Sequence, residues 1–192
     1  MRAPLFGLAT SLCFLTGGCV TRSEERLLAV GGVHVLEGPA PCRLLRASPT
    51  SALEDLHWKD TLALRARGEG AAEVASGSST LRLRLVEPAR LTIVLVDEKI
   101  VTNERFHVRA RLYDGRGREL EVGKFTEIAW SCSSGLEIHN DLSAGEFGLC
   151  DTCFGTHGFR ATRPGEGLIE ARLGQVKGTL PVNVPRPSSG SK

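Results

Sequence analysis

The chain has 192 residues, which allows one large domain or two small ones, and its 41% hydrophobic content is enough for a packed core. Its 24 basic and 22 acidic side chains nearly cancel, and no block of like charge stands out, so nucleic acid is not an expected partner. The 22 glycines and 9 prolines favour many short strands joined by turns.

Residues 1–18 have the features of a secretory signal peptide. Arg2 gives a positive start, an apolar run extends from Leu5 to Leu15, and small residues lead to Cys19. The run is shorter than the ~20 apolar residues that a membrane-spanning helix needs. We therefore expect residues 1–18 to be removed on export.

The segment Leu15–Cys19 resembles the lipobox of bacterial lipoproteins, in which the cysteine is acylated and becomes the first residue. It departs from that pattern because the leucine normally stands three places before the cysteine, where this chain has Thr16. The resemblance implies lipidation of Cys19, and thus a membrane anchor, with ordinary cleavage and a plain thiol as the alternative. Val20 follows in place of an inner-membrane retention aspartate, which favours an outer-membrane lipoprotein facing the periplasm or the surface.

The first half of the mature chain is predicted to hold a tether and a small domain. Residues 19–30 are interpreted as a polar tether, and residues 31–88 as a short β-domain. Within it, the segment Thr80–Leu85 alternates leucine with threonine or arginine, which predicts a strand with one buried face. The pattern of a helical turn occurs only in Ser51–Trp58.

The second half continues this alternation. Residues 106–112 and 128–132 alternate apolar with polar side chains, and residues 91–96 are apolar and β-branched. Trp130 and Cys132 are two positions apart on a predicted strand, so both point into the core. The sequence therefore predicts an all-β protein with antiparallel sheets, and a disordered Pro/Ser/Gly-rich tail over residues 185–192.

A weak internal repeat links the two halves. Gly68-Glu69-Gly70 precedes a strand that ends before Pro88, and Gly165-Glu166-Gly167 precedes a strand that ends before Pro185. The offset of about one hundred residues is the length of one immunoglobulin-type sandwich. Each segment is interpreted as closing one β-domain, and chance similarity between two glycine turns is the alternative.

Residues 89–184 resemble the bacterial immunoglobulin-like domains of the group 2 type. The resemblance rests on the order of six motifs: Leu91–Ile93, Arg109–Gly115, Ile128–Trp130, Gly158–Thr162, Pro164–Ala171 and Leu180–Val184. It implies an immunoglobulin-like antiparallel β-sandwich, preceded by the smaller β-domain. Cys132, Cys150, Cys153 and the long stretch 143–156 depart from the family pattern, and a long loop on a rigid sandwich is a common place for binding.

Four cysteines remain in the mature chain besides Cys19: Cys42, Cys132, Cys150 and Cys153. In an exported protein an even number predicts two disulfides, with three possible connectivities. We favour Cys132 bonded to one member of the Cys150–Cys153 pair and Cys42 bonded to the other. The alternative is a local Cys150–Cys153 bridge with Cys42 bonded to Cys132.

Two kinds of cysteine chemistry compete with this prediction. Cys150 and Cys153 form a Cys-x-x-Cys pair that could be a redox centre, although a turn rather than a helix follows it. Zinc could bind Cys132 and this pair with His157 or His139 as the fourth ligand, although an oxidising compartment disfavours it. We expect neither a metal nor a cofactor, since the acidic residues 137, 141, 146 and 151 also match no calcium loop.

The sequence contains no nucleophile elbow, P-loop, zinc-protease or dinucleotide motif. We therefore expect a non-enzymatic envelope lipoprotein whose immunoglobulin-like β-domains act as a structural, adhesion or protein-binding module, with an envelope protein or a glycan as partner. One alternative is an accessory subunit of a larger secretion or motility complex. Another is a thiol-dependent periplasmic redox protein that uses Cys150 and Cys153.

Overall fold

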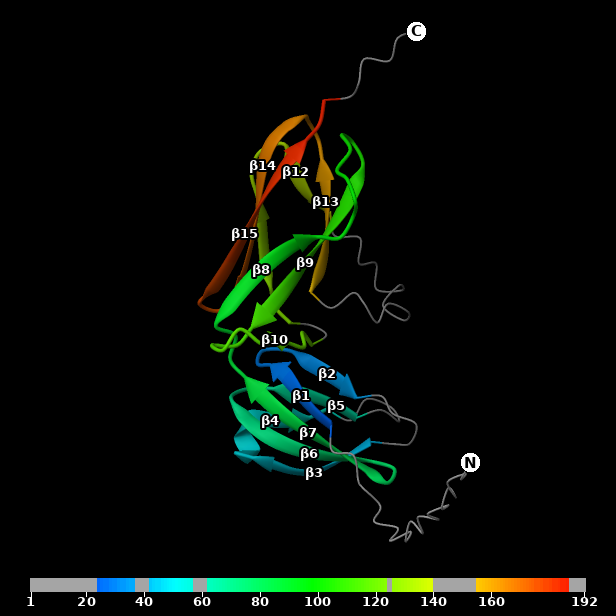
Figure 1. Cartoon of the computed structure of the whole chain (residues 1–192), viewed down its shortest axis with the longest axis vertical. Helices are drawn as coiled ribbons and strands as arrows, with labels where there is room; N and C mark the ends of the chain where they lie inside the picture. The colour runs from blue at the N-terminus through cyan, green and yellow to red at the C-terminus, as the bar shows by residue number, and fades with distance from the viewer. Residues whose placement is uncertain (1–23, 37–41, 57–61, 124–125, 140–154, 187–192) are drawn as a thin grey trace, which may run out of the picture.

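The computed structural model describes residues 24–36, 42–56, 62–123, 126–139 and 155–186. They form two β-sandwiches stacked end to end (Figure 1). Within the described ranges the single helical element is a 3₁₀ turn, η1 at Thr50–Ala52, and no helix there is long and apolar enough to cross a membrane. The all-β prediction is thus confirmed.

The described residues of the first sandwich form seven strands. Their bounds are Glu24–Ala29 (β1), Val33–Leu36 (β2), Cys42–Ser48 (β3), Leu53–Asp55 (β4), Leu62–Ala66 (β5), Gly70–Ser76 (β6) and Ser79–Val86 (β7). One sheet has the order β1-β7-β6-β3 and the other the order β2-β5-β4. All pairs are antiparallel except β1 with β7, which run parallel.

The strand β1 lies inside the stretch predicted to be a tether, so that prediction is wrong for residues 24–30. Leu28 and Ala29 are fully buried and Val30 is nearly so. Burial of these side chains holds the segment against the protein, and its backbone is paired with β7 over six residues. The first sandwich therefore begins at Glu24 rather than at residue 31.

Eight strands lie in the described part of the second sandwich. Their bounds are Arg90–Leu95 (β8), Arg105–Tyr113 (β9), Glu119–Leu120 (β10), Ala129–Cys132 (β11), Leu136–His139 (β12), Thr156–Ala161 (β13), Gly165–Leu173 (β14) and Val176–Val184 (β15). One sheet has the order β8-β9-β13-β12, with β10 paired to the end of β9, and the other has the order β11-β14-β15. If the strands other than β10 are lettered A to G along the chain, the first sheet has the order A-B-E-D and the second the order C-F-G. This is the arrangement of an immunoglobulin-like sandwich, as predicted.

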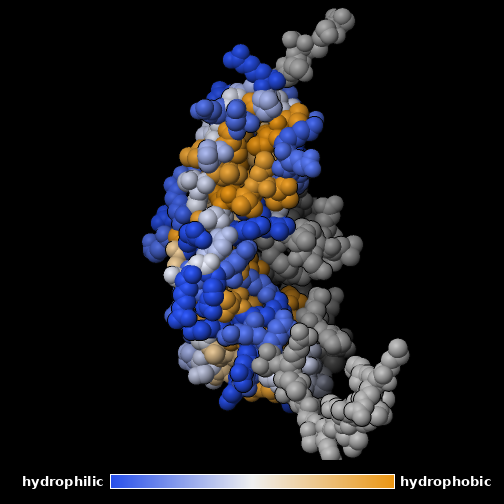
Figure 2. Space-filling view, viewed as in Figure 1, coloured by the Kyte–Doolittle hydropathy of each residue, from blue (hydrophilic) through white to orange (hydrophobic). Residues whose placement is uncertain are grey.

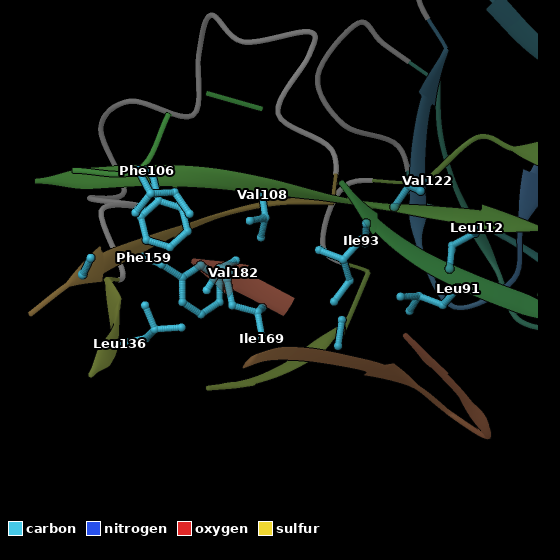
Figure 3. Close-up of a cluster of buried hydrophobic side chains, with 14 of the residues drawn as sticks. Leu91, Ile93, Phe106, Val108, Leu112, Val122, Leu136, Phe159, Ile169 and Val182 are labelled. Atoms are coloured by element: carbon cyan, nitrogen blue, oxygen red, sulfur yellow. The ribbon is translucent and has the colours of Figure 1, made fainter. Parts of the chain in front are cut away.

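The core of the second sandwich follows from the alternation in its strands. Phe106, Val108, Ala110 and Leu112 of β9 are all buried, while the residues between them are more exposed. Phe106 stacks on Phe159 of β13, with ring centroids 6.0 Å apart. Figure 3 shows these side chains meeting Ile169 and Val182 of the facing sheet, among other buried residues.

The internal repeat corresponds to equivalent hairpins. Gly68-Glu69-Gly70 leads into the β6–β7 hairpin, and Gly165-Glu166-Gly167 leads into the β14–β15 hairpin. In both sandwiches this hairpin supplies the last two strands, F and G of the immunoglobulin order. Each repeat therefore closes one sandwich.

The helical turn expected over Ser51–Trp58 is wrong for most of its described part. The 3₁₀ turn ends at Ala52, and Leu53–Asp55 is the strand β4. Leu53 is buried and lies opposite Ala66 of β5, so pairing with that strand and burial in the first core favour the extended form.

Candidate functional site

The two sandwiches share the strand β1. Leu28 packs in the core of the first sandwich, whereas Leu27 and Ala29 pack against the core of the second. Alternate side chains of a strand point to opposite faces, so a single strand serves two cores. The backbone adds a second link, since Ala29 N–H donates to Glu121 O at 3.0 Å and Glu121 N–H donates to Leu27 O at 2.8 Å.

Side chains and close backbone contact strengthen this junction. Arg26 forms a bidentate ion pair with Glu121. Its Nε lies 2.9 Å from Oε2, and its Nη2 contacts Oε1. Gly32 and Gly123 lie back to back, so a Cβ on Gly123 would stand 2.8 Å from the carbonyl oxygen of Val33. This close approach requires glycine at both positions.

His34 is buried at the same junction, with 2% of its surface exposed. Its Nε2 lies 3.0 Å from Ala29 O, and its Nδ1 has no hydrogen-bond partner among the described residues. Burial lowers the pKa of His34 below the usual 6.5, against the opposing effects of the Ala29 carbonyl and of Glu121. The ring is therefore neutral at physiological pH.

A groove of about 930 Å³ lies beside the junction, where the turn between β9 and β10 stands over the outer face of the β1-β7-β6-β3 sheet. Clefts between domains are common ligand sites. Figure 2 shows hydrophilic residues around this region, and hydrophobic surface gathered on the second sandwich. The charged residues of its lining are Glu25, Arg46, Glu69, Glu73, Arg82, Arg84, Asp114, Arg116 and Arg118.

A row of alternating charge crosses one part of the groove. The strand register places Glu25, Arg82, Glu73 and Arg46 side by side on four neighbouring strands. Glu73 Oε1 lies 2.7 Å from Arg46 and 3.7 Å from Arg82. The hydrogen bond from Arg46 lowers the pKa of the Glu73 carboxyl, so Glu73 is ionised between its two arginines.

The turn of the second sandwich forms the opposite wall. Asp114 is 5% exposed; its Oδ1 accepts hydrogen bonds from the backbone N–H groups of Arg116 at 2.9 Å and Arg118 at 2.8 Å. Its Oδ2 accepts one from Arg118 Nε at 2.8 Å. Burial acts to raise the pKa of Asp114, but these hydrogen bonds lower it overall, so the carboxylate holds the turn in one shape.

Cys42 and Cys132, the predicted site residues that the structure describes, do not line this groove. Cys19, Cys150 and Cys153 fall outside the described residues, so lipidation and their disulfides remain predictions. Cys42 packs against the first core and Cys132 against the second, and no disulfide joins these two in the structure.

Cys132 lies with Trp130 on the inner face of β11, as expected. Its Sγ donates to Leu136 O at 3.3 Å. Burial and the charge of Glu137 raise the pKa of the Cys132 thiol, which makes it a poor nucleophile.

His157 stacks on the Trp130 ring, with centroids 5.3 Å apart and planes 8° apart. Burial lowers its pKa, so a neutral ring completes an aromatic cluster with Phe159. His139 lies on β12. Among the residues that the structure describes, no three His, Cys, Asp or Glu side chains are grouped to hold a metal ion.

No protein-family model matches this chain, and no curated protein matches it. Several solved structures of low similarity do. Domains 4–9 of the surface layer protein SbsC are 13% identical, with a TM-score of 0.38, over 86% of this chain and 30% of that one. FdeC, an Escherichia coli adhesin, is 13% identical with a TM-score of 0.37 over 84% and 62%, respectively. Invasin, a bacterial integrin-binding protein, is 9% identical with a TM-score of 0.39 over 82% and 33%.

This chain spans less than two thirds of each of these three structures. Likeness at this level shows no shared function, and the strand order described above defines the fold. The junction and its groove therefore have to be interpreted from their own chemistry.

Proposed function

We propose that this protein is a non-enzymatic envelope lipoprotein whose two joined immunoglobulin-like sandwiches form one stiff module that binds a partner protein. The observation that carries the proposal is the double role of β1, with Leu28 in one core and Ala29 in the other. A shared strand fixes the angle between the sandwiches. A fixed angle keeps the groove in one shape, which reduces the entropic cost of binding.

The proposed lipid at Cys19 would hold this rigid module next to a membrane. Only five peptide steps separate Cys19 from Glu24, the first residue of β1, and an extended chain spans at most about 18 Å over that length. A chain acylated at Cys19 would thus carry its first sandwich close against the membrane. The outer membrane is the proposed site.

The anchor is tested by the intact mass of the protein purified from its native membrane, before and after reduction and alkylation. We expect a chain that begins at Cys19 and carries acyl groups. A chain without acyl groups would refute the anchor. The alkyl groups added only after reduction count the cysteines that are bonded in the native protein.

The binding role is tested by cross-linking in intact cells, followed by denaturing electrophoresis of this chain. We expect one discrete heavier species of constant mass in addition to the monomer. A monomer alone at every cross-linker concentration would contradict a partner-binding module. A partner that stays in stoichiometric complex after detergent extraction would identify the chain as an accessory subunit of a larger assembly.

A further inference from the structure

We propose that the interdomain groove binds an acidic peptide segment of the partner, with Arg84 and Arg116 as the side chains that receive its carboxylates. The inference rests on the proposed function, because it names the chemistry of the partner. It follows from which charges in the groove are already paired within the chain and which are not.

Arg84 is exposed, and the residues beside it on the neighbouring strands of the sheet are uncharged. The register places Leu27 on one side of it, and Ala71 and then Ser48 on the other. Among the described residues Arg84 has no ion pair. Since its neighbours on these strands are uncharged, they offer its guanidinium no ion pair, and its side chain lines the groove.

Arg116 faces the same space from the second sandwich. Its backbone N–H is held by Asp114, which orders the turn, while its side chain is exposed and makes no ion pair with any described residue. The two unpaired arginines thus come from different sandwiches, and the rigid junction holds their relative position.

Two of the four acidic residues of the lining, Glu73 and Asp114, are ion-paired within the chain. Glu73 binds Arg46 and Arg82, and Asp114 binds Arg118 and its own turn. Glu69 accepts a hydrogen bond from the backbone of Glu87 at 3.3 Å, and Glu25 lies beside Arg82 in the register. Five arginines against four acidic residues leave the lining with a net charge of +1. Arginine presents its donors in a fork that matches a carboxylate.

The residues that line the groove favour a peptide over a sugar chain. Among the described residues its lining contains no aromatic side chain on which a sugar ring could stack. Small residues of β3 and β6, Ser48, Gly70 and Ala71, are also part of the lining. The row of alternating charge beside it can pair with further polar side chains of the same segment.

The test is fluorescence anisotropy with a labelled, C-terminally amidated peptide of alternating Glu and Ser, using the full mature chain at low salt. We expect saturable binding that weakens about fivefold in Arg84→Gln or Arg116→Gln and about twentyfold in the double variant. A matched peptide with Gln in place of Glu should not bind. Arg172→Gln, on the exposed face of β14, is the control variant and should bind like the parent.

A charge swap sharpens the test. The double variant Arg84→Glu/Arg116→Glu should lose the Glu peptide and gain a peptide of alternating Lys and Ser. Both arginines are exposed, so thermal unfolding of these variants should match that of the parent protein. The inference is overturned if the Glu peptide binds the double Gln variant as well as the parent, or does not saturate the parent.

A carboxylated oligosaccharide separates the two classes of partner. Tighter binding of an oligogalacturonate than of the Glu peptide would overturn the peptide assignment. The cellular cross-link gives an independent result. If it persists in Arg84→Gln/Arg116→Gln, the groove is not the binding site while the partner-binding function stands. If it is absent from the parent protein, the proposed function itself fails.

Discussion

Arg26 of the first sandwich and Glu121 of the second form an ion pair through both nitrogens of one edge of the guanidinium and both carboxylate oxygens. The same segments are joined by two backbone hydrogen bonds between Glu121 and the strand β1. The ion pair and the backbone hydrogen bonds therefore both join Glu121 to the strand β1. Because the ion pair links residues 95 positions apart, it connects the cores rather than stabilising one local element.

The contribution of this ion pair should be modest and sensitive to salt. Its side chains are 30% and 37% exposed, so solvent screening limits the coupling to about 0.5–1 kcal/mol. A double-mutant cycle with Arg26→Gln and Glu121→Gln, followed by urea unfolding, should give this coupling at low salt and less of it in 1 M NaCl. Coupling of zero at low salt would show that the ion pair contributes nothing to the junction.

Gly123→Ala should destabilise the junction by about 1–3 kcal/mol, because the added Cβ meets backbone atoms of Val33 and Gly32 that cannot move aside. Differential scanning calorimetry should show a lower melting temperature, or two transitions in place of one. Gly68→Ala is the matched control, since a Cβ there meets no atom within 4 Å. Equal melting temperatures for the two variants would mean that the back-to-back glycines are not required.

Acid should loosen the junction through His34. Because burial lowers the pKa of His34, the unfolded chain takes up a proton at a higher pH than the folded protein does. The neutral ring therefore makes its full contribution to stability when the pH is above 6.5, the ordinary pKa of histidine. This contribution declines as the pH falls below that value. Urea unfolding between pH 5.5 and 7.5 should show this decline, and His34→Gln should reduce its slope.

His157 provides the control for that measurement. Its pKa is also lowered by burial, so it adds to the same decline. His157→Phe keeps an aromatic ring against Trp130 and removes the titration of that site alone. If His34→Gln leaves the slope unchanged while His157→Phe abolishes it, the acid sensitivity belongs to the second core and not to the junction.

Cys132 should react slowly with iodoacetamide in the folded, reduced protein at pH 7.5. Its thiol pKa is raised by burial and by Glu137, so little of the reactive thiolate is present. Mass spectrometry of the tryptic peptide after timed alkylation, with and without urea, measures the difference. Alkylation of Cys132 at the rate of the unfolded chain would contradict its burial and reopen thiol chemistry at this position.

Alternation of apolar and polar residues predicted the strands with one solvent-exposed face. The patterns at residues 80–85 and 106–112 correspond to β7 and β9, and Trp130 and Cys132 point inward as expected. The strand β1 was missed because both of its faces are covered from Leu27 to Ala29. A strand buried on both sides has an apolar run, here Leu27–Val30, in place of alternation. Its polar start made it resemble a tether.

The groove could not be predicted because no local motif encodes it. Its charges come from residues 25, 46, 73, 82 and 84 of four strands and from a turn near residue 116, and the strand register alone makes them neighbours. The motif Arg109–Gly115, which includes Asp114, was recognised from the sequence. Its place in the wall of the groove, however, depends on the position of the other sandwich, and sequence periodicity does not predict that position.

The parallel pairing of β1 with β7 has a mechanical consequence for a chain held at Cys19. A pull between that end and the second sandwich would draw β1 and β7 in opposite directions along their own axes. Their six paired positions, from Glu24 with Leu81 to Ala29 with Val86, would then bear the load together instead of opening one after another. Force spectroscopy should therefore find the first sandwich resistant to extension in this direction, and a proline at Leu27 should lower the rupture force.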